Sequence, residues 1–100
     1  MTPQLGAALA AEEAAIYAYG VIGVHLNSRG EETEARTAER AHRGRRDYLI
    51  TRLAQLQAGS APSPAGYELP PVTDRASALE LAIQVEELSL IHISEPTRPY

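Results

Sequence analysis

The chain has 100 residues, a formal net charge of −4 at pH 7, and neither cysteine nor lysine. This length allows one domain with a modest core. The absence of cysteine excludes disulfides and thiolate metal sites, and the mild acidity argues against nucleic-acid binding. The start lacks the features of a signal peptide, and no apolar stretch reaches the ~20 residues that span a bilayer. We therefore expect a soluble cytoplasmic protein with no membrane or nucleic-acid partner.

The first predicted helix begins at Thr2, which suits an N-cap, and ends near Leu26. The turn at residues 27–30 follows it, and Asn27 suits a left-handed position after the helix. The inward stripe of this helix is predicted at helical spacing and consists of Leu5, Leu9, Glu12, Ile16, Tyr19 and Gly23.

A second predicted helix covers residues 31–57 and is opened by a capping box between Ser28 and Glu31. The short turn before it makes the first two helices antiparallel neighbours, and Gly59 is expected to end the second. Its apolar face is set by Leu49, Leu53 and Leu56. Extended backward by turns, this face reaches Arg45 or Arg46, then His42, then Ala38 and Ala35, with Glu39 at its border.

Residues 59–73 contain four prolines and are predicted to be non-helical. Fifteen extended residues reach about 50 Å, whereas the second helix is about 40 Å long. The segment can therefore return along the whole bundle as a packed strap, although a disordered linker is the alternative. A third helix, capped by Thr73 or Asp74, then runs parallel to the second. Its inner stripe is predicted to be Leu79, Ala82, Ile83 and Glu86.

Two kinds of site are compatible with the inward polar residues. An E-x-x-H pair projects a carboxylate and an imidazole from one side of a helix, and such pairs build di-metal sites in helix bundles. The candidate ligands for iron or manganese are Glu12, Glu39, His42 and Glu86. A complete site has four carboxylates and two histidines, so this set is short. The alternative is an ionic network in which Arg45 or Arg46 neutralises the carboxylates.

Residues 5–87 resemble the ferritin-like superfamily, and more closely a bacterial ferritin-like domain family of undefined function. The resemblance is carried by one motif in each predicted helix, Glu12-x-x-Ala15-x-x-x-Tyr19, Glu39-x-x-His42 and Ala82-Ile83-x-x-Glu86. The run of residues 11–21 and the Arg45-Arg46-Asp47 triplet point to the family of undefined function.

The resemblance implies an all-α fold, a truncated ferritin-like four-helix bundle of three helices with a long crossover between the second and third. Residues 1–87 would form the ferritin-like domain without its fourth helix. Residues 88–98 resemble a translated sequencing adapter, so residues 88–100 are interpreted as a non-native tail. The alternative is a genuine short strand or an extension of the third helix.

The function expected from these features is that of a fragment of a ferritin-like protein of undefined role, without intact catalysis and without a cofactor. One alternative is a di-iron or di-manganese carboxylate protein, either an oxidoreductase or a metal store, in the full-length parent. Another is a helical protein-interaction module that self-associates through an uncovered bundle face.

Overall fold

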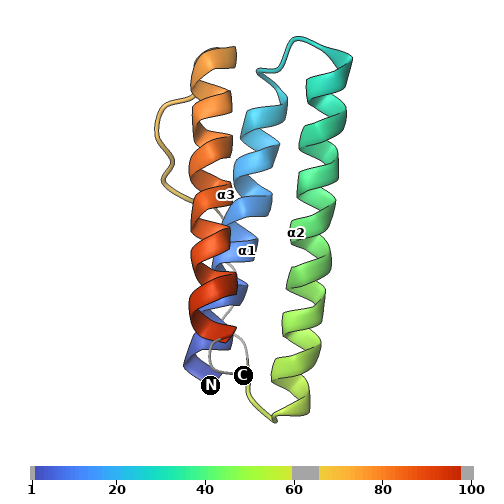
Figure 1. The fold of residues 1–100 in the computed structure, drawn as a ribbon, viewed down its shortest axis with the longest axis vertical. Helices are drawn as coiled ribbons and strands as arrows, with labels where there is room; N and C mark the ends of the chain where they lie inside the picture. The colour runs from blue at the N-terminus through green and yellow to red at the C-terminus, as the bar shows by residue number, and fades with distance from the viewer. Residues whose placement is uncertain (1, 60–65, 98–100) are drawn as a thin grey trace.

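The computed structural model describes residues 2–59 and 66–97 and contains three helices (Figure 1). They are α1 (Thr2–Gly23), α2 (Arg29–Gln55) and α3 (Arg75–Thr97). Within the described residues there is no strand. The prediction of an all-α bundle of three helices is therefore confirmed.

α1 packs against both α2 and α3 and runs antiparallel to them (Figure 1). α2 and α3 run parallel, because residues at the same distance from the start of each helix contact one another. Glu31, near the start of α2, pairs with Arg75 at the start of α3. His42 contacts Glu86, about three turns further along each helix. The predicted crossover topology is thus confirmed.

The strap that leads into α3 packs on the bundle over its described part, residues 66–74. The ring of Tyr67 lies 5.2 Å from the ring of Tyr17 on α1. Leu69 and Val72 pack against the core. The predicted packed strap is therefore present from residue 66 onward, whereas Pro62 and Pro64 lie outside the described residues.

The core consists of two apolar clusters, one on each side of the polar pair Glu12 and His42. The first joins α1 to α3 and contains Ala18, Tyr19, Ile22, Ala78 and Leu81. The second joins α1 to α2 and contains Leu5, Leu9, Leu49 and Leu53. α1 therefore has a separate hydrophobic contact with each of its two neighbours.

The buried surface of α1 is wider than the single predicted stripe. Of that stripe, Ile16 and Gly23 are only half-buried, and the remaining four residues are buried. Ala15, Ala18 and Ile22 are buried as well. A single stripe describes a helix with one neighbour, whereas α1 has two.

The predicted inner stripe of α3 is wrong at Ile83, whose exposed fraction is 61%. Among residues 75–88 of α3, those that are buried are Ala78 and Leu81. Because α3 packs on α1, the face that starts at Ala78 points inward. The neighbouring face of α3 carries Leu79 and Ile83 and is rotated by one residue from the Ala78 face. It borders the space between α3 and α2.

The predicted first residues of the helices agree with the structure better than the predicted last residues do. Ser28 caps α2 by accepting a hydrogen bond from the Glu31 N–H at 3.1 Å. Asp74 caps α3 by accepting one from the Ser77 N–H at 2.9 Å. Both starts are predicted from the same rule, that a short oxygen-bearing side chain satisfies a free N–H at the first turn.

The end of α2 differs from the prediction. α2 ends at Gln55, and among the described non-glycine residues only Gln57 has a positive φ, at 57°. The Ala58 N–H donates to the Leu53 carbonyl at 2.9 Å, which forms a Schellman motif. The predicted left-handed position at Asn27 is absent, and α1 ends at Gly23 rather than Leu26.

α3 continues through Thr97 and includes most of the segment 88–100. Residues 98–100 lie outside the described part. A helical backbone does not distinguish a native extension from an added tail, so the origin of this segment stays a prediction.

Residues Pro3–Gly23 of α1 are long and apolar enough to cross a membrane by length and composition, with a mean hydropathy of 1.3. The expectation that no apolar stretch is long enough to span a bilayer is therefore wrong for these residues. The core helix of a soluble protein passes the same test, and α1 packs against two helices. Two packed faces give α1 a reason to be apolar.

Candidate functional site

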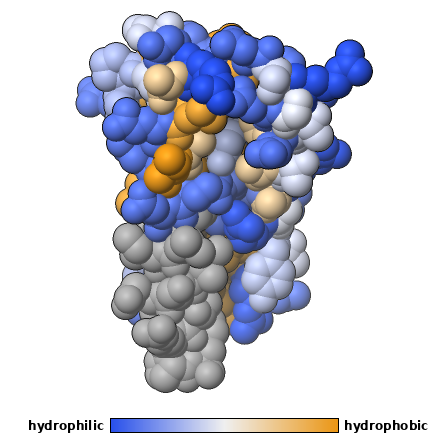
Figure 2. Space-filling model, turned by 45° about the horizontal axis from the view of Figure 1, so that its top comes forward, coloured by the Kyte–Doolittle hydropathy of each residue, from blue (hydrophilic) through white to orange (hydrophobic). Residues whose placement is uncertain are grey.

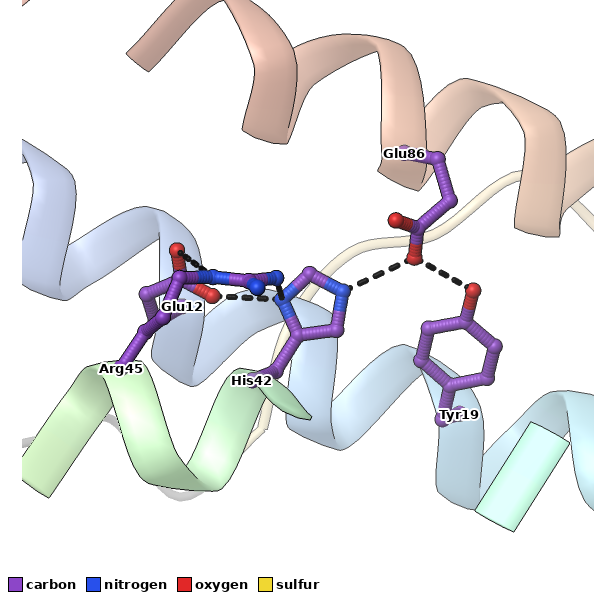
Figure 3. A network of polar contacts seen from close by, with 5 residues as sticks. All are labelled: Glu12, Tyr19, His42, Arg45 and Glu86. Atoms are coloured by element: carbon purple, nitrogen blue, oxygen red, sulfur yellow. Dashed lines mark hydrogen bonds and ion pairs between the residues drawn. The ribbon is translucent and has the colours of Figure 1, made fainter. Parts of the chain in front are cut away.

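The centre of the bundle holds a polar cluster that begins at Glu12 on α1 (Figure 3). His42 of α2 places its Nδ1 atom 2.5 Å from Glu12 Oε1, and Arg45, one turn further along α2, donates from Nε to Glu12 Oε2 at 3.1 Å. Glu12 is 2% exposed and His42 is fully buried. A buried carboxylate is stabilised only by such close donors.

The cluster extends from His42 to α3 through Glu86. His42 Nε2 lies 2.8 Å from Glu86 Oε2, and the same oxygen accepts a hydrogen bond from the Tyr19 hydroxyl at 2.5 Å (Figure 3). The Glu86 side chain is 46% exposed. The cluster therefore links all three helices and runs from a dry centre to the surface.

The geometry favours a doubly protonated His42 ring. A neutral imidazole has one N–H, whereas both ring nitrogens of His42 face carboxylate oxygens. The imidazolium donates to Glu12 and to Glu86. With Arg45, the cluster then holds two cations and two anions. Arg45 Nη2 also lies 3.0 Å from His42 Nδ1, a contact between cations that the shared partner Glu12 offsets.

The pKa shifts of the cluster agree with this charge arrangement. Burial alone would lower the pKa of His42, but its hydrogen bonds to Glu12 and Glu86 outweigh burial and raise that pKa above its ordinary value. Burial would raise the pKa of Glu86, but hydrogen bonds from His42 and Tyr19 lower it. Burial and the Glu86 hydrogen bond raise the pKa of Tyr19, so its phenol stays protonated.

These shifts predict a bounded pH window of stability. The raised pKa of His42 stabilises the fold fully below the ordinary histidine value of about 6.5, and this contribution is lost as pH rises through the folded pKa. The lowered pKa of Glu86 stabilises the fold above the ordinary glutamate value of about 4.3, and this contribution is lost as pH falls through the folded pKa. Urea unfolding from about pH 2 to about pH 9 measures both limits.

The control for this window is His25→Gln, which removes a histidine just after α1 whose Nδ1 atom lies 3.2 Å from the Val21 carbonyl oxygen, outside the cluster. It should keep the alkaline fall in the free energy of unfolding, and His42→Gln should lose it. A free energy that rises steadily from pH 6 to pH 9 would contradict the imidazolium.

The structure brings together three of the four predicted ligand residues, Glu12, His42 and Glu86. Glu39 lies outside the cluster, and its carboxylate is 3.6 Å from Arg43 Nη2, one turn along the same helix. Arg45 joins the cluster.

Of the two arginines considered as partners, Arg46 does not join the cluster, because it pairs with Asp47 at 3.0 Å. Tyr19 was not a predicted site residue. The available signal was its place two turns after Glu12 on one stripe of α1.

This donor set does not fit a metal ion as it is arranged. Glu12 uses one carboxylate oxygen for His42 and the other for Arg45, and both nitrogens of His42 face carboxylates. A ligating imidazole needs a free lone pair. Within the described residues, no group of three or more potential ligands is placed to hold an ion.

Fold and site together define a helical bundle with a buried ionic cluster, and comparison with known proteins places it in a family. The model of a domain of unknown function (DUF4439) matches residues 4–92. The chain belongs to this family. The matched region extends beyond Glu87, the predicted end of the domain.

A solved structure is similar to this chain. It is the crystal structure of a conserved hypothetical protein, rv2844, from Mycobacterium tuberculosis, with 34% sequence identity and a TM-score of 0.84. The similarity covers 90% of this chain and 68% of that chain. None of the curated proteins matches.

Proposed function

We propose that this chain is a ferritin-like helical bundle with a structural or binding role, in which an ionic network takes the place of a metal centre. The observation that carries this proposal is the charge balance around Glu12, whose two oxygens face His42 and Arg45. Two carboxylates in a dry site repel one another unless cations neutralise them. Here the protein's own side chains supply those cations.

The ferritin-like part of the proposal is supported by topology and motif placement. α2 and α3 are parallel and joined by a long strap, which is the connectivity of ferritin-like bundles with one crossover. Glu12 and Tyr19 of the first motif both face the centre. In this fold the corresponding place commonly holds carboxylate-bound metal.

A non-catalytic role is supported by the poor access of substrates to the centre of the cluster. Glu12 and His42 are buried, so a substrate does not reach them without unfolding of the core. Glu86 and Arg45, at the two ends of the cluster, expose 46% and 38% of their side chains to solvent. The cluster is therefore suited to holding the helices together. The compartment that we propose for this soluble bundle is the cytoplasm.

Metal content tests the proposal. The protein is produced in medium supplemented with iron and manganese, purified without chelator, and analysed for both elements beside His42→Ala and Glu34→Ala. We expect much less than one ion per chain in all three proteins. About one iron or manganese ion per chain that is lost in His42→Ala and kept in Glu34→Ala would replace this proposal with the di-metal alternative.

Self-association is the second candidate role. Ile83 and Leu88 on α3 are 61% and 57% exposed, and exposed apolar side chains favour association. Sedimentation velocity over a hundredfold concentration range distinguishes a monomer from a dimer. A dimer that becomes monomeric in Ile83→Glu would support this role, and a monomer at all concentrations would exclude it.

A further inference from the structure

Two tyrosines from distant parts of the chain meet where the strap crosses α1. Tyr17 belongs to α1 and Tyr67 to the strap. Their ring centres are 5.2 Å apart and the ring planes are tilted by 60°, and aromatic pairs are in contact at about 4.5–7 Å. Tyr17 is 40% exposed and Tyr67 is half-buried. The strap therefore holds two phenol rings in contact at a place that solvent reaches.

The edge of the Tyr17 ring that carries the hydroxyl faces the strap. Gly66 lies so close to this edge that a β-carbon at its position would be 3.3 Å from Tyr17 Oη and 3.8 Å from Tyr17 Cε2. Cε2 is a ring carbon next to the carbon that bears the hydroxyl, and a phenoxyl radical couples at such carbons. The edge of Tyr17 that can form a new bond therefore points toward the residue that precedes Tyr67.

The tyrosine pair lies on the side of α1 away from the opening between α2 and α3. Tyr19 lines that opening with Ile22 and Leu26, and Figure 2 shows apolar surface on that side, bordered by hydrophilic side chains. Tyr17 precedes Tyr19 by two residues, which is a rotation of about 200° around a helix. A helix that covers the opening would therefore leave the tyrosine pair exposed.

The other described tyrosines are placed differently. Tyr19 is buried and donates its hydroxyl hydrogen to Glu86. Tyr48 on α2 is 66% exposed, and within the described residues its ring is paired with no other aromatic ring. Tyr48 is therefore more open to an oxidant than Tyr17 is, but it lacks a second phenol beside it.

The phenol of Tyr67 is neutral at pH 7. Burial and the negative charge of Glu13 raise the pKa of Tyr67 above its ordinary value, which is about 10 for tyrosine. Removal of an electron from a neutral phenol releases its proton as well. Oxidation of this ring is therefore the loss of a whole hydrogen atom.

We propose that Tyr17 and Tyr67 form a site of oxidative cross-linking, at which a haem peroxidase that uses hydrogen peroxide joins the two rings and ties the strap to α1. Each phenol gives up one electron and one proton, and together these reduce one hydrogen peroxide to two molecules of water. The two phenoxyl radicals then form a carbon–carbon bond between ring positions next to the hydroxyls. The hydrogen on each coupled carbon moves through water to the oxygen of its own ring, so both phenols are restored.

The cross-link would close the chain between positions 17 and 67, a segment that includes all of α2. A covalent link across a long segment stabilises a fold mainly by restricting the unfolded chain, as a disulfide does. We therefore expect the melting temperature to rise by about 10 °C or more. This site goes beyond the proposed ionic network, because it does not depend on what neutralises Glu12.

Oxidation of the full chain tests the proposal. The protein is treated at pH 7 with a haem peroxidase and limiting hydrogen peroxide, both in the native state and in urea. Dityrosine fluorescence detects the product, and mass spectrometry of proteolytic peptides identifies the joined residues, since the product is lighter by two hydrogen atoms. In the native state we expect the Tyr17–Tyr67 product within one chain to exceed every other tyrosine pairing at least about tenfold, because rings in contact need not meet by diffusion. In urea this preference should disappear.

Three variants locate the site. Tyr17→Phe and Tyr67→Phe each keep a ring in the contact but remove the phenol, so both should abolish the cross-link and the rise in melting temperature, with circular dichroism as the check on folding. Tyr48→Phe is the matched control, because it removes a more exposed phenol outside the contact. It should leave the yield of the Tyr17–Tyr67 product unchanged.

The proposal fails if the native protein forms no cross-link, or if the main products join separate chains or involve Tyr48, because the contact then does not direct the coupling. A Tyr17–Tyr67 product that forms equally well in urea would also overturn it. So would a purified cross-linked protein that melts at the same temperature as the untreated chain, since the strap would then not be tied to the fold.

Discussion

Glu12→Ala should lower the free energy of unfolding by roughly 3–5 kcal/mol, because removing one partner of a buried ion pair leaves the other charge uncompensated. His42 would lose its acceptor at 2.5 Å and Arg45 its acceptor at 3.1 Å. Of the two carboxylates described beside these neighbouring cations, Glu86 would remain. For a domain of this length, the loss corresponds to a fall in melting temperature of about 15–30 °C.

The matched control for this prediction is Glu34→Ala, an exposed glutamate on α2 with no ion pair in the described chain. Its cost should stay within about 0.5 kcal/mol. Glu12→Gln should fall between the two, because it keeps the shape but removes the charge. Urea unfolding at pH 7 measures all three. A loss below about 1 kcal/mol in Glu12→Ala would mean that the cluster contributes little to the fold.

Leu53→Ala should cost about 2–5 kcal/mol, the range for deleting a buried leucine side chain from a packed core. Leu53 is 2% exposed and lies in the cluster that joins α1 to α2 with Leu5, Leu9 and Leu49. Because this cluster is small, its neighbours have few side chains that can fill the space left behind. The effect should be visible in both urea and thermal unfolding.

Ile50→Ala is the control for the leucine, since Ile50 is on the same helix but 42% exposed. It should cost much less than Leu53→Ala. Similar losses in the two variants would indicate that the face of α2 toward α1 is misassigned. Leu5→Ala, from the opposite side of the cluster, should reproduce the effect of Leu53→Ala.

The helices and their order follow from the sequence because the local signals are strong. Ser28 before α2 and Asp74 before α3 satisfy free N–H groups. The four prolines between α2 and α3 exclude a helix there. Which face of α3 is buried does not follow, because that depends on the direction from which α1 packs. The hydrophobic pattern of α3 does not distinguish the face with Ile83 from the face with Ala78. Only the contact with α1 decides which face is buried.

The site is predictable in its residues but not in its pairing. Helical spacing puts Glu12 and His42 on inward faces, and it puts Glu39 at a border. Arg45 and Arg46 are neighbours in the sequence, and their side chains leave α2 about 100° apart. The hydrophobic pattern does not show which of the two points inward. Helical spacing puts Tyr19 on the same inward face as Glu12, but its hydrogen bond to Glu86 joins α1 to α3. Spacing within one helix does not encode which residue of a neighbouring helix is contacted.

The charge state of His42 tests the account most directly, because the network requires an imidazolium between two carboxylates. Nitrogen NMR of the labelled ring, assigned with His42→Gln, reports whether each nitrogen carries a proton between pH 5 and pH 9. The account predicts protons on both nitrogens at pH 7, with deprotonation above the ordinary value of about 6.5. A ring with one bare nitrogen at pH 7 would contradict it.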